Sequence, residues 1–238
     1  MKNRILHNFK RLVQEGKKSF AVLIDPDKMP SDDFVHQLNR ACDFVFVGGS
    51  HLSVGHMGTC LEKLRKHLDL PLVIFPGSPN QIDQNADAIF LLTLISGRNP
   101  DLLIGRHVES AHILKESGLE IIPTGYLLID GGKMTTAAYI SNTQPIPQEK
   151  TDLVVSTALA GQQLGLQAIY LDCGSGADKS ASIEIINKIK KEVSLPLIVG
   201  GGVKSKEEVH RLQMAGADVV VVGNLFETNP EAIRSFIR

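Results

Sequence analysis

The chain alternates between short apolar runs and longer amphipathic segments along almost its whole length. Short apolar runs bounded by glycine, proline and polar clusters predict buried strands, whereas apolar residues that recur every three or four positions predict helices. We expect eight strands, at residues 20–24, 43–47, 71–75, 88–92, 119–129, 167–171, 197–199 and 219–222. We expect helices at residues 5–14, 31–41, 57–67, 100–117, 151–164, 182–191, 205–214 and 230–237.

Strands that alternate with crossover helices form parallel sheets. The pattern therefore predicts the α/β class and, with eight such units, a (β/α)8 TIM barrel that forms a single domain over residues 1–238.

Three segments depart from a regular alternation. Few residues separate the strands at 71–75 and 88–92, so we expect the barrel to be modified at its third helix. The apolar stretch at 119–129 is broken by Pro123-Thr124-Gly125, and we expect one strand with its continuation or an excursion beyond the barrel rim. Residues 131–150 are polar without a hydrophobic period, which predicts a long loop that serves as a lid or a binding element.

The amino-acid composition argues against a nucleic-acid-binding, membrane-spanning or secreted protein. With 238 residues, 43% of them hydrophobic, the chain can bury the core of one large barrel, and a net charge of −1 gives no basic field for nucleic acid. The apolar runs are too short to span a membrane, and the N-terminus lacks a signal-peptide pattern, so we expect a cytoplasmic protein. Cys42, Cys60 and Cys173 have no metal-ligand spacing and are expected to be reduced thiols.

The exits of the last two strands are rich in glycine. Gly200-Gly201-Gly202 follows the seventh strand, and Gly223-Asn224 follows the eighth. Glycines let a ligand approach backbone N–H groups closely, and the loops after the last two strands of a TIM barrel commonly hold a phosphate. We therefore expect a phosphate-binding C-terminal half; the alternative is that these glycines only form tight turns.

Polar side chains follow the earlier strands. Asp25 and Ser50 end the first two strands, and a carboxylate beside a hydroxyl suits Mg²⁺, which prefers oxygen ligands and completes its shell with water and phosphate oxygens. In the alternative, Asp25 caps a turn and Ser50 is a turn hydroxyl. Asp172, after the sixth strand, acts either as a general base or as a cap over the glycine loop. Arg98 suits a diphosphate or a surface ion pair.

Eight motifs, taken together and in order, resemble the geranylgeranylglyceryl phosphate synthase family, in the branch found in archaea and some bacteria. They are LIDPDK at 23–28, VGGS at 47–50, FPGSPNQI at 75–82, ISGRNPDLLIG at 95–105, IPTGYLLIDGG at 122–132, IYLDCGSGA at 169–177, IVGGGV at 198–203 and VVGN at 221–224. The resemblance covers residues 20–226 and includes a barrel whose third helix is replaced by a non-helical segment.

The resemblance implies a prenyltransferase in which the C3 hydroxyl of sn-glycerol 1-phosphate attacks C1 of a prenyl diphosphate. It implies Mg²⁺ as the cofactor, with Asp25 and Ser50 as its ligands, and Asp172 as the catalytic base. It also implies a homo-oligomer, dimeric or hexameric. The glycerol-phosphate cradle would be formed by Tyr170, Leu171, Asp172, Cys173, Gly174, Ser175, Gly176, Gly201, Gly202, Gly223 and Asn224.

One position departs from the family pattern. Asp172 stands where the family usually has glutamate, so the carboxylate reaches less far by more than an ångström, an error that costs about 10²-fold in rate when it misplaces a catalytic group. Two other functions stay open. One is a sugar-phosphate isomerase that uses Asp25 and Asp172 as an acid/base pair without metal, and the other is a non-catalytic glycerol-phosphate binding protein.

Overall fold

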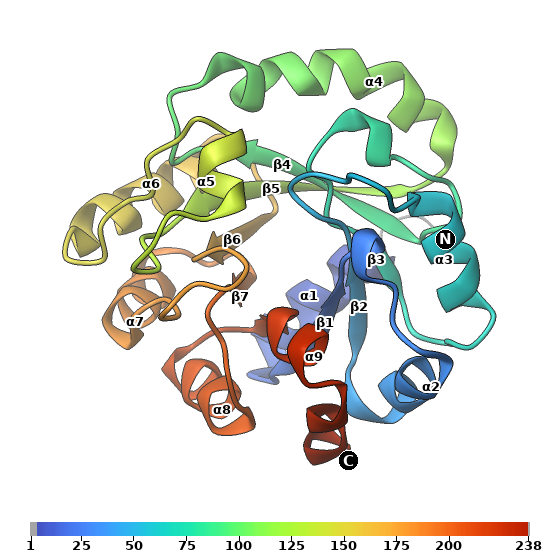
Figure 1. Cartoon of the computed structure of the whole chain (residues 1–238). Helices are drawn as coiled ribbons and strands as arrows, with labels where there is room; N and C mark the ends of the chain where they lie inside the picture. Colours follow the sequence, from blue (N-terminus) through green and yellow to red (C-terminus); the bar gives the residue numbers. More distant parts are fainter. Residues whose placement is uncertain (1–3, 238) are drawn as a thin grey trace.

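Eight parallel strands close into a barrel in the computed structural model, which describes residues 4–237 (Figure 1). Each strand pairs with the next one along the chain, and β8 pairs with β1. The strands are β1 (Ser19–Ile24), β2 (Phe44–Val47), β3 (Leu72–Ile74), β4 (Ala88–Leu94), β5 (Glu120–Leu128), β6 (Ala168–Asp172), β7 (Leu197–Gly200) and β8 (Val219–Val222). The predicted (β/α)8 barrel is confirmed.

Helices surround the barrel, and several begin where the sequence offers a serine cap. The hydroxyls of Ser31, Ser182 and Ser205 each accept an N–H from the first turn of the following helix. The helices are α1 (Arg4–Glu15), α2 (Asp32–Ala41), α3 (Met57–Arg65), α4 (Arg106–Ser117), α5 (Thr136–Ile140), α6 (Thr151–Gln163), α7 (Ile183–Glu192), α8 (Lys206–Ala215) and α9 (Asn224–Thr228). Over residues 4–237, none of these helices is long and apolar enough to cross a membrane.

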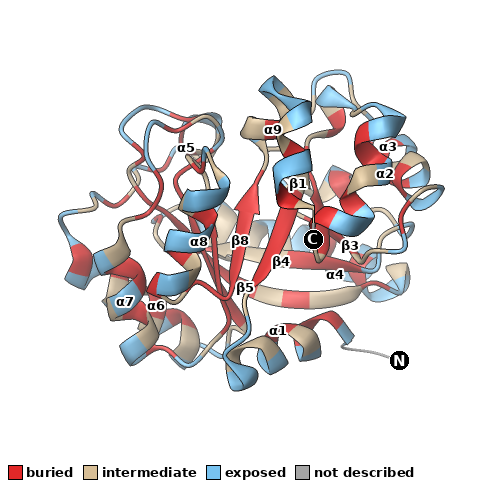
Figure 2. Cartoon of the chain, turned by 90° about the horizontal axis from the view of Figure 1, so that it is seen from below, coloured by how far each residue is buried: buried red, intermediate tan, exposed pale blue. Residues whose placement is uncertain are grey.

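The core has two parts because both faces of the barrel strands are covered. One cluster fills the space between the strands and the helices, and the other fills the barrel interior. Helix α1 closes the N-terminal end of the barrel, opposite α5 and α9 (Figure 2). Its Phe9 ring lies 5.0 Å from the Phe44 ring, and the Glu120 carboxylate accepts the Ile5 and Leu6 N–H groups at 2.8 and 2.7 Å. The opposite end is thereby left as the open one.

The third unit lacks its helix, as predicted. Between β3 and β4 the chain forms only a 3-10 turn, Pro79–Gln81. Strand β5 runs through Pro123 as one strand, as predicted, and the chain continues past its end into an isolated bridge between Ile129 and Ile146. Proline removes one N–H, but the Pro123 carbonyl still accepts the Gln167 N–H at 2.7 Å and keeps the strand in register.

Three other segments differ from the prediction. Residues 131–150 are not a plain loop, because they contain α5, whose first turn is capped by Thr135. The helix expected at 100–117 begins with a π-helical turn, Asp101–Gly105, before α4. The C-terminal helix is a 3-10 helix, Pro230–Phe236, and α9 precedes it. Helices of five residues are too short to show a hydrophobic period, and tertiary contacts decide them.

Candidate active site

Asp172, the last residue of β6, lies buried at the C-terminal end of the barrel with both carboxylate oxygens hydrogen-bonded. Oδ1 accepts the Gly174 N–H at 2.6 Å, and Oδ2 accepts the Tyr126 hydroxyl at 2.5 Å. Burial raises the pKa of Asp172 above its ordinary value, and these two hydrogen bonds oppose that shift. Asp172 is thus a cap over the glycine loop, and it is also a carboxylate whose protonated form is favoured by burial.

The loops after β6 and β7 pack backbone against backbone. Gly174 and Gly201 have φ values of +86° and +80°, which L residues rarely adopt. A Cβ atom at Gly201 would lie 2.5 Å from the Gly174 nitrogen and 2.8 Å from Asp172 Oδ1. The packing therefore requires glycine at these turns, and a role in holding a ligand stays a prediction.

The residues that follow β8 lie close to the loops after β6 and β7. A Cβ atom at Gly176 would lie 4.0 Å from Asn224 Oδ1, so the loop after β6 reaches the first residue of α9. The Asn224 amide donates to the Glu227 carboxylate at 3.2 Å, and Gly202 packs on the Lys179 carbonyl. The structure thus brings the glycines and Asn224 of the predicted cradle together from three strand ends.

The predicted cradle residues do not all face the open end in the same way. Leu171 and Cys173 belong to the cluster between the barrel and the helices, so a ligand at the open end would meet only their backbone. Tyr170 lies in the barrel interior with its ring 4.8 Å from the Phe75 ring, whereas Ser175 is exposed. Alternation along β6 accounts for this division, because successive side chains point to opposite faces.

Asp25 packs against Gly49, the residue before Ser50. A Cβ atom at Gly49 would lie 3.2 Å from Asp25 Oδ1, and the next residue is Ser50. Asp25 Oδ1 accepts the Asp27 N–H at 3.0 Å, which confirms the turn cap, while Oδ2 lies 3.7 Å from the Lys28 ammonium. Burial raises the pKa of Asp25, and the Asp27 N–H and the Lys28 ammonium oppose that shift.

This arrangement fits a hard cation that keeps most of its water. A partly buried carboxylate next to a serine offers only oxygen ligands, which Mg²⁺ prefers. Within residues 4–237 no three His, Cys, Asp or Glu side chains are clustered to hold a metal, so the protein would supply a minority of the ligands. Such a site leaves room for phosphate oxygens.

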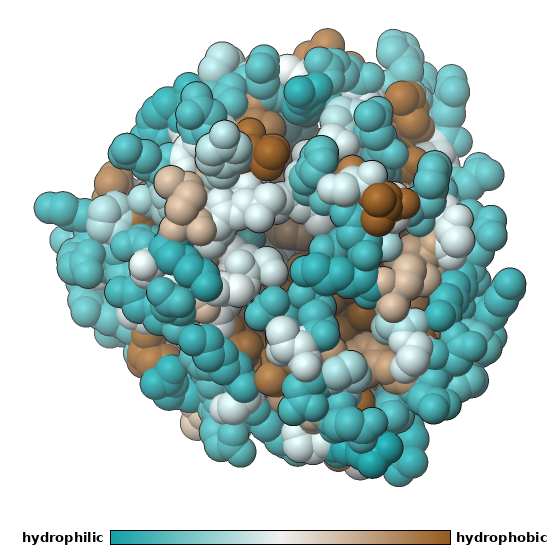
Figure 3. Space-filling view, in the orientation of Figure 1, coloured by the Kyte–Doolittle hydropathy of each residue, from teal (hydrophilic) through white to brown (hydrophobic). Residues whose placement is uncertain are grey.

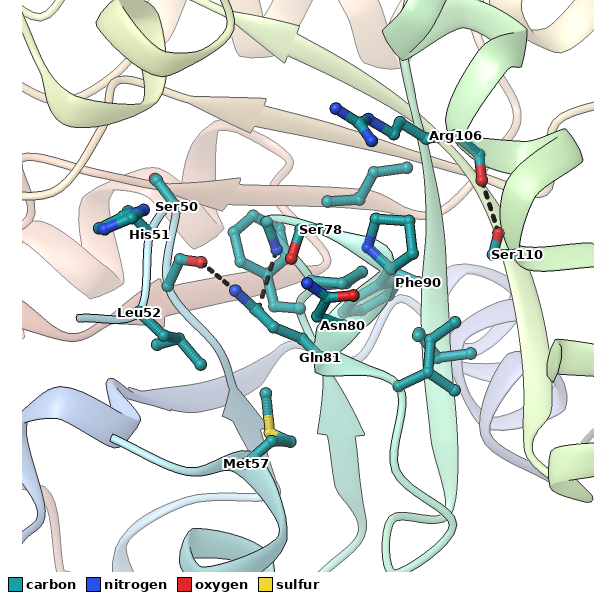
Figure 4. A pocket seen from close by; sticks show the side chains of 18 of the residues that line it. Ser50, His51, Leu52, Met57, Ser78, Asn80, Gln81, Phe90, Arg106 and Ser110 are labelled. Carbon is teal, nitrogen blue, oxygen red and sulfur yellow. Dashed lines mark hydrogen bonds between the residues drawn. The ribbon is translucent and has the colours of Figure 1, made fainter. Parts of the chain in front are cut away.

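An apolar groove of about 550 Å³ begins beside Ser50 and Tyr126 and extends under α4. Figure 3 shows the open end of the barrel hollowed near its centre, with apolar surface at depth. The wall on the β3 side is held by Gln81, which donates to the Gly49 carbonyl at 2.9 Å and accepts the Gly77 N–H at 3.0 Å (Figure 4). Apolar lining residues include Leu52, Met57, Phe75, Ile82, Ile89, Phe90, Leu91, Leu92, Leu94, Leu102, Leu114 and Ile140.

The segment 131–150 touches both parts of the site. Ala137, Ile140 and Ser141 line the groove, and a Cβ atom at Gly174 would lie 2.6 Å from Thr135. The expected binding element is therefore in contact with the groove on one side and the glycine loop on the other. A movement of this segment would therefore change both the groove and the glycine loop after β6.

Sequence reasoning missed Tyr126 and the groove lining on α4, and a contact of Arg98 with a diphosphate stays a prediction. A functional role for Tyr126 could not be recognised from the sequence, because an aromatic residue inside a strand is most often a core residue. Arg98 donates to the carbonyls of its own loop, Gly97 at 2.8 Å and Ile95 at 3.3 Å, and lies outside the groove lining. The spacing of Leu102, Ser110 and Leu114 was a signal, but it could not be told from ordinary packing.

The chain is similar to known proteins along nearly its whole length. Residues 12–238 match the PcrB family. A geranylgeranylglyceryl phosphate synthase of Chitinophaga pinensis is 46% identical, over 98% of this chain and 94% of its own, and one of Pyrococcus furiosus is 37% identical, over 90% and 86%. The crystal structure of (S)-3-O-geranylgeranylglyceryl phosphate synthase from Thermoplasma acidophilum, in complex with its substrate sn-glycerol 1-phosphate, superposes with a TM-score of 0.89. It is 30% identical and covers 99% of this chain and 97% of its own.

Proposed function

This chain belongs to the PcrB family, and we propose that it is a prenyltransferase that joins a geranylgeranyl or similar prenyl group to the C3 hydroxyl of sn-glycerol 1-phosphate. The prenyl diphosphate is the donor, and diphosphate is released. One observation carries the proposal: an apolar groove and a glycine-lined cradle meet at the buried pair of Tyr126 and Asp172.

The acceptor binds at the exits of β6, β7 and β8. Loops whose glycines leave the backbone bare suit a phosphate, which accepts N–H groups from several directions. The relative from Thermoplasma acidophilum binds sn-glycerol 1-phosphate on the same fold, which supports this choice of acceptor. The phosphate is then held by Gly174, Ser175, Gly176, Gly201, Gly202, Gly223 and Asn224, with the hydroxyl end toward Asp172.

The donor occupies the groove under α4. A hydrocarbon tail gains free energy roughly in proportion to the apolar area that it removes from water, and the groove offers aliphatic walls. Ser50 lines the groove at the end beside Asp25, so the diphosphate lies there and the tail extends toward Leu114. When bound at Asp25 and Ser50, Mg²⁺ neutralises the charge that develops on the leaving diphosphate.

The protein's own residues prepare the acceptor and the electrophilic carbon. The C3 oxygen forms a bond to C1 of the prenyl group as the bond from C1 to the diphosphate oxygen breaks, and Asp172 is the final acceptor of the hydroxyl proton. The Tyr170 ring lies behind the groove, 4.8 Å from the Phe75 ring and 5.8 Å from the Tyr126 ring. The Phe75 and Tyr126 rings line the groove itself and lie 5.8 Å apart. Their π faces stabilise the partial positive charge on the allylic carbon.

The test is a Mg²⁺-dependent assay with radiolabelled sn-glycerol 1-phosphate and prenyl diphosphates of increasing length. We expect label that partitions into organic solvent only with Mg²⁺, and not with the sn-glycerol 3-phosphate enantiomer. Binding of sn-glycerol 1-phosphate without product for any donor would reject the transferase and leave a binding protein. Conversion of a sugar phosphate without metal would instead indicate an isomerase.

A further inference from the structure

The hydroxyl of Tyr126 stands between the groove and the catalytic carboxylate. Tyr126 lines the groove, its side chain is only 9% exposed, and its hydroxyl is 2.5 Å from Asp172 Oδ2. The ring is fixed by Phe75 and Tyr170, each with its centroid 5.8 Å away. A phenol held this rigidly keeps a lone pair for a group that arrives from the open end.

Asp172 is poorly placed to meet the acceptor by itself. It is 8% exposed, Gly174 and Tyr126 each occupy one of its oxygens, and the loop at Gly201 packs over Oδ1. The other buried phenol nearby, Tyr170, has its hydroxyl against Gly200, where a Cβ atom would lie 2.6 Å away. Tyr126 is therefore the hydroxyl that links Asp172 to the groove.

We propose that Tyr126 is a catalytic residue that relays the acceptor's proton to Asp172, an inference that rests on the proposed function. The O–H bond of the C3 hydroxyl breaks and a bond from that proton to Tyr126 Oη forms, while the Tyr126 proton moves to Asp172 Oδ2. The electron pair freed on the C3 oxygen forms the bond to C1, and the pair of the broken C1–O bond leaves with diphosphate. The proton on Asp172 returns to water after product release.

Charge supports this direction of transfer. Burial raises the pKa of Asp172, so the carboxylate has more affinity for a proton than an exposed one. The titratable groups that act on Tyr126 are Asp172, Tyr170 and Cys173, and burial raises the pKa values of the last two, so both stay neutral near pH 7. The phenol itself never needs to become a stable phenolate, because it gains a proton as it loses one.

The first test replaces Tyr126 by phenylalanine, which keeps the ring and removes the relay. We expect kcat to fall about 100-fold, within the range of general acid–base catalysis, while the Kd for sn-glycerol 1-phosphate changes less than about 3-fold. Thr124→Val is the matched control, because it removes another buried hydroxyl of β5, one that donates to the Ile122 carbonyl at 2.8 Å. This control should keep kcat within about 2-fold of the wild type.

The second test combines Tyr126→Phe with Asp172→Glu in a double-mutant cycle. A carboxylate one methylene longer reaches past the phenol position, so the loss caused by Tyr126→Phe should shrink to less than about 5-fold in the glutamate background. An equal loss in both backgrounds would overturn the relay, because Tyr126 would then only position its neighbours. Retention of kcat by Tyr126→Phe in the wild-type background would overturn it as well.

If the glutamate variant does not fold, the pH profile of Tyr126→Phe distinguishes a proton relay from a role in tuning the Asp172 carboxylate. The Tyr126 hydrogen bond lowers the pKa of Asp172, so its loss should shift the acid limb of kcat to higher pH. A relay predicts that the plateau above this limb stays about 100-fold low, whereas recovery of the wild-type plateau would show that Tyr126 only tunes the carboxylate. A wild-type protein without turnover would reject the proposed function itself, and the relay with it.

Discussion

Replacing Gly201 by alanine should lower both the stability of the fold and the affinity for the acceptor. A substitution at a second glycine separates backbone strain from steric overlap as the cause. At a φ of +80° an L residue costs about 1 kcal/mol, and the new Cβ would lie 2.5 to 2.8 Å from atoms of Cys173, Gly174 and Asp172. Two of these atoms are backbone nitrogens, which cannot swing away, so the loops after β6 and β7 must separate at a further cost of about 2 kcal/mol.

Gly118→Ala is the matched control because Gly118 has a φ of +75° with nothing within 4 Å of an added Cβ. For a chain of this size 1 kcal/mol shifts Tm by about 3 °C, so we expect Tm to fall by about 3 °C for Gly118→Ala and about 9 °C for Gly201→Ala. Calorimetric titration should show a Kd for sn-glycerol 1-phosphate at least about 10-fold higher for Gly201→Ala alone. Equal effects of the two substitutions would refute the packing argument.

Three further substitutions test other parts of the molecule. Asp25→Asn should abolish Mg²⁺-dependent turnover and leave the Kd for sn-glycerol 1-phosphate within about 3-fold; turnover with normal Mg²⁺ dependence would rule out Asp25 as a ligand. Ser110→Phe should fill the groove and shorten the longest prenyl donor used, with Glu109→Phe on the exposed face as control; an unchanged donor range would place the tail elsewhere. Asp218→Ala should lower the free energy of unfolding by about 3 kcal/mol in urea titrations, because Lys18 and Lys190 lose their buried partner, and a loss below about 1 kcal/mol would contradict this.

The fold could be predicted from the sequence because barrel strands are buried on both faces. Such strands are continuous apolar runs, so all eight were found near their observed bounds, and the shortage of residues between β3 and β4 revealed the missing helix. Helix α5 could not be predicted in this way, because its five residues depend on the Thr135 cap and on contact with Gly174. Sequence patterns reveal only local periodicity, whereas the conformation of α5 is determined by contacts with residues distant in the sequence.

The same limit applies to the candidate site. The positions of Asp25, Ser50 and Asp172 at the open end could be predicted, because these residues end or follow strands and strand exits meet at one end of a barrel. Tyr126 could not, because its partner is 46 residues away along the chain and the pairing of Leu128 with Asp172 in the β5–β6 register brings the two together. The groove lining was missed for a related reason: the residues of α4 have the spacing of ordinary core residues.

In the proposed function, the absence of a helix between β3 and β4 explains how one barrel holds two unlike substrates. A full crossover helix after β3 would cover the surface where α4 and residues 75–82 now face each other, and the groove would be core. The cradle lies at β6 to β8, across the barrel, so the groove can open without disturbing it. Tyr126 and Asp172 link the two parts, because Tyr126 lines the groove and its hydroxyl donates to Asp172, which accepts the Gly174 N–H of the glycine loop. In the proposed function, the diphosphate lies beside Ser50, the tail under α4 and the acceptor over the glycines, and this order follows from which helix the chain omits.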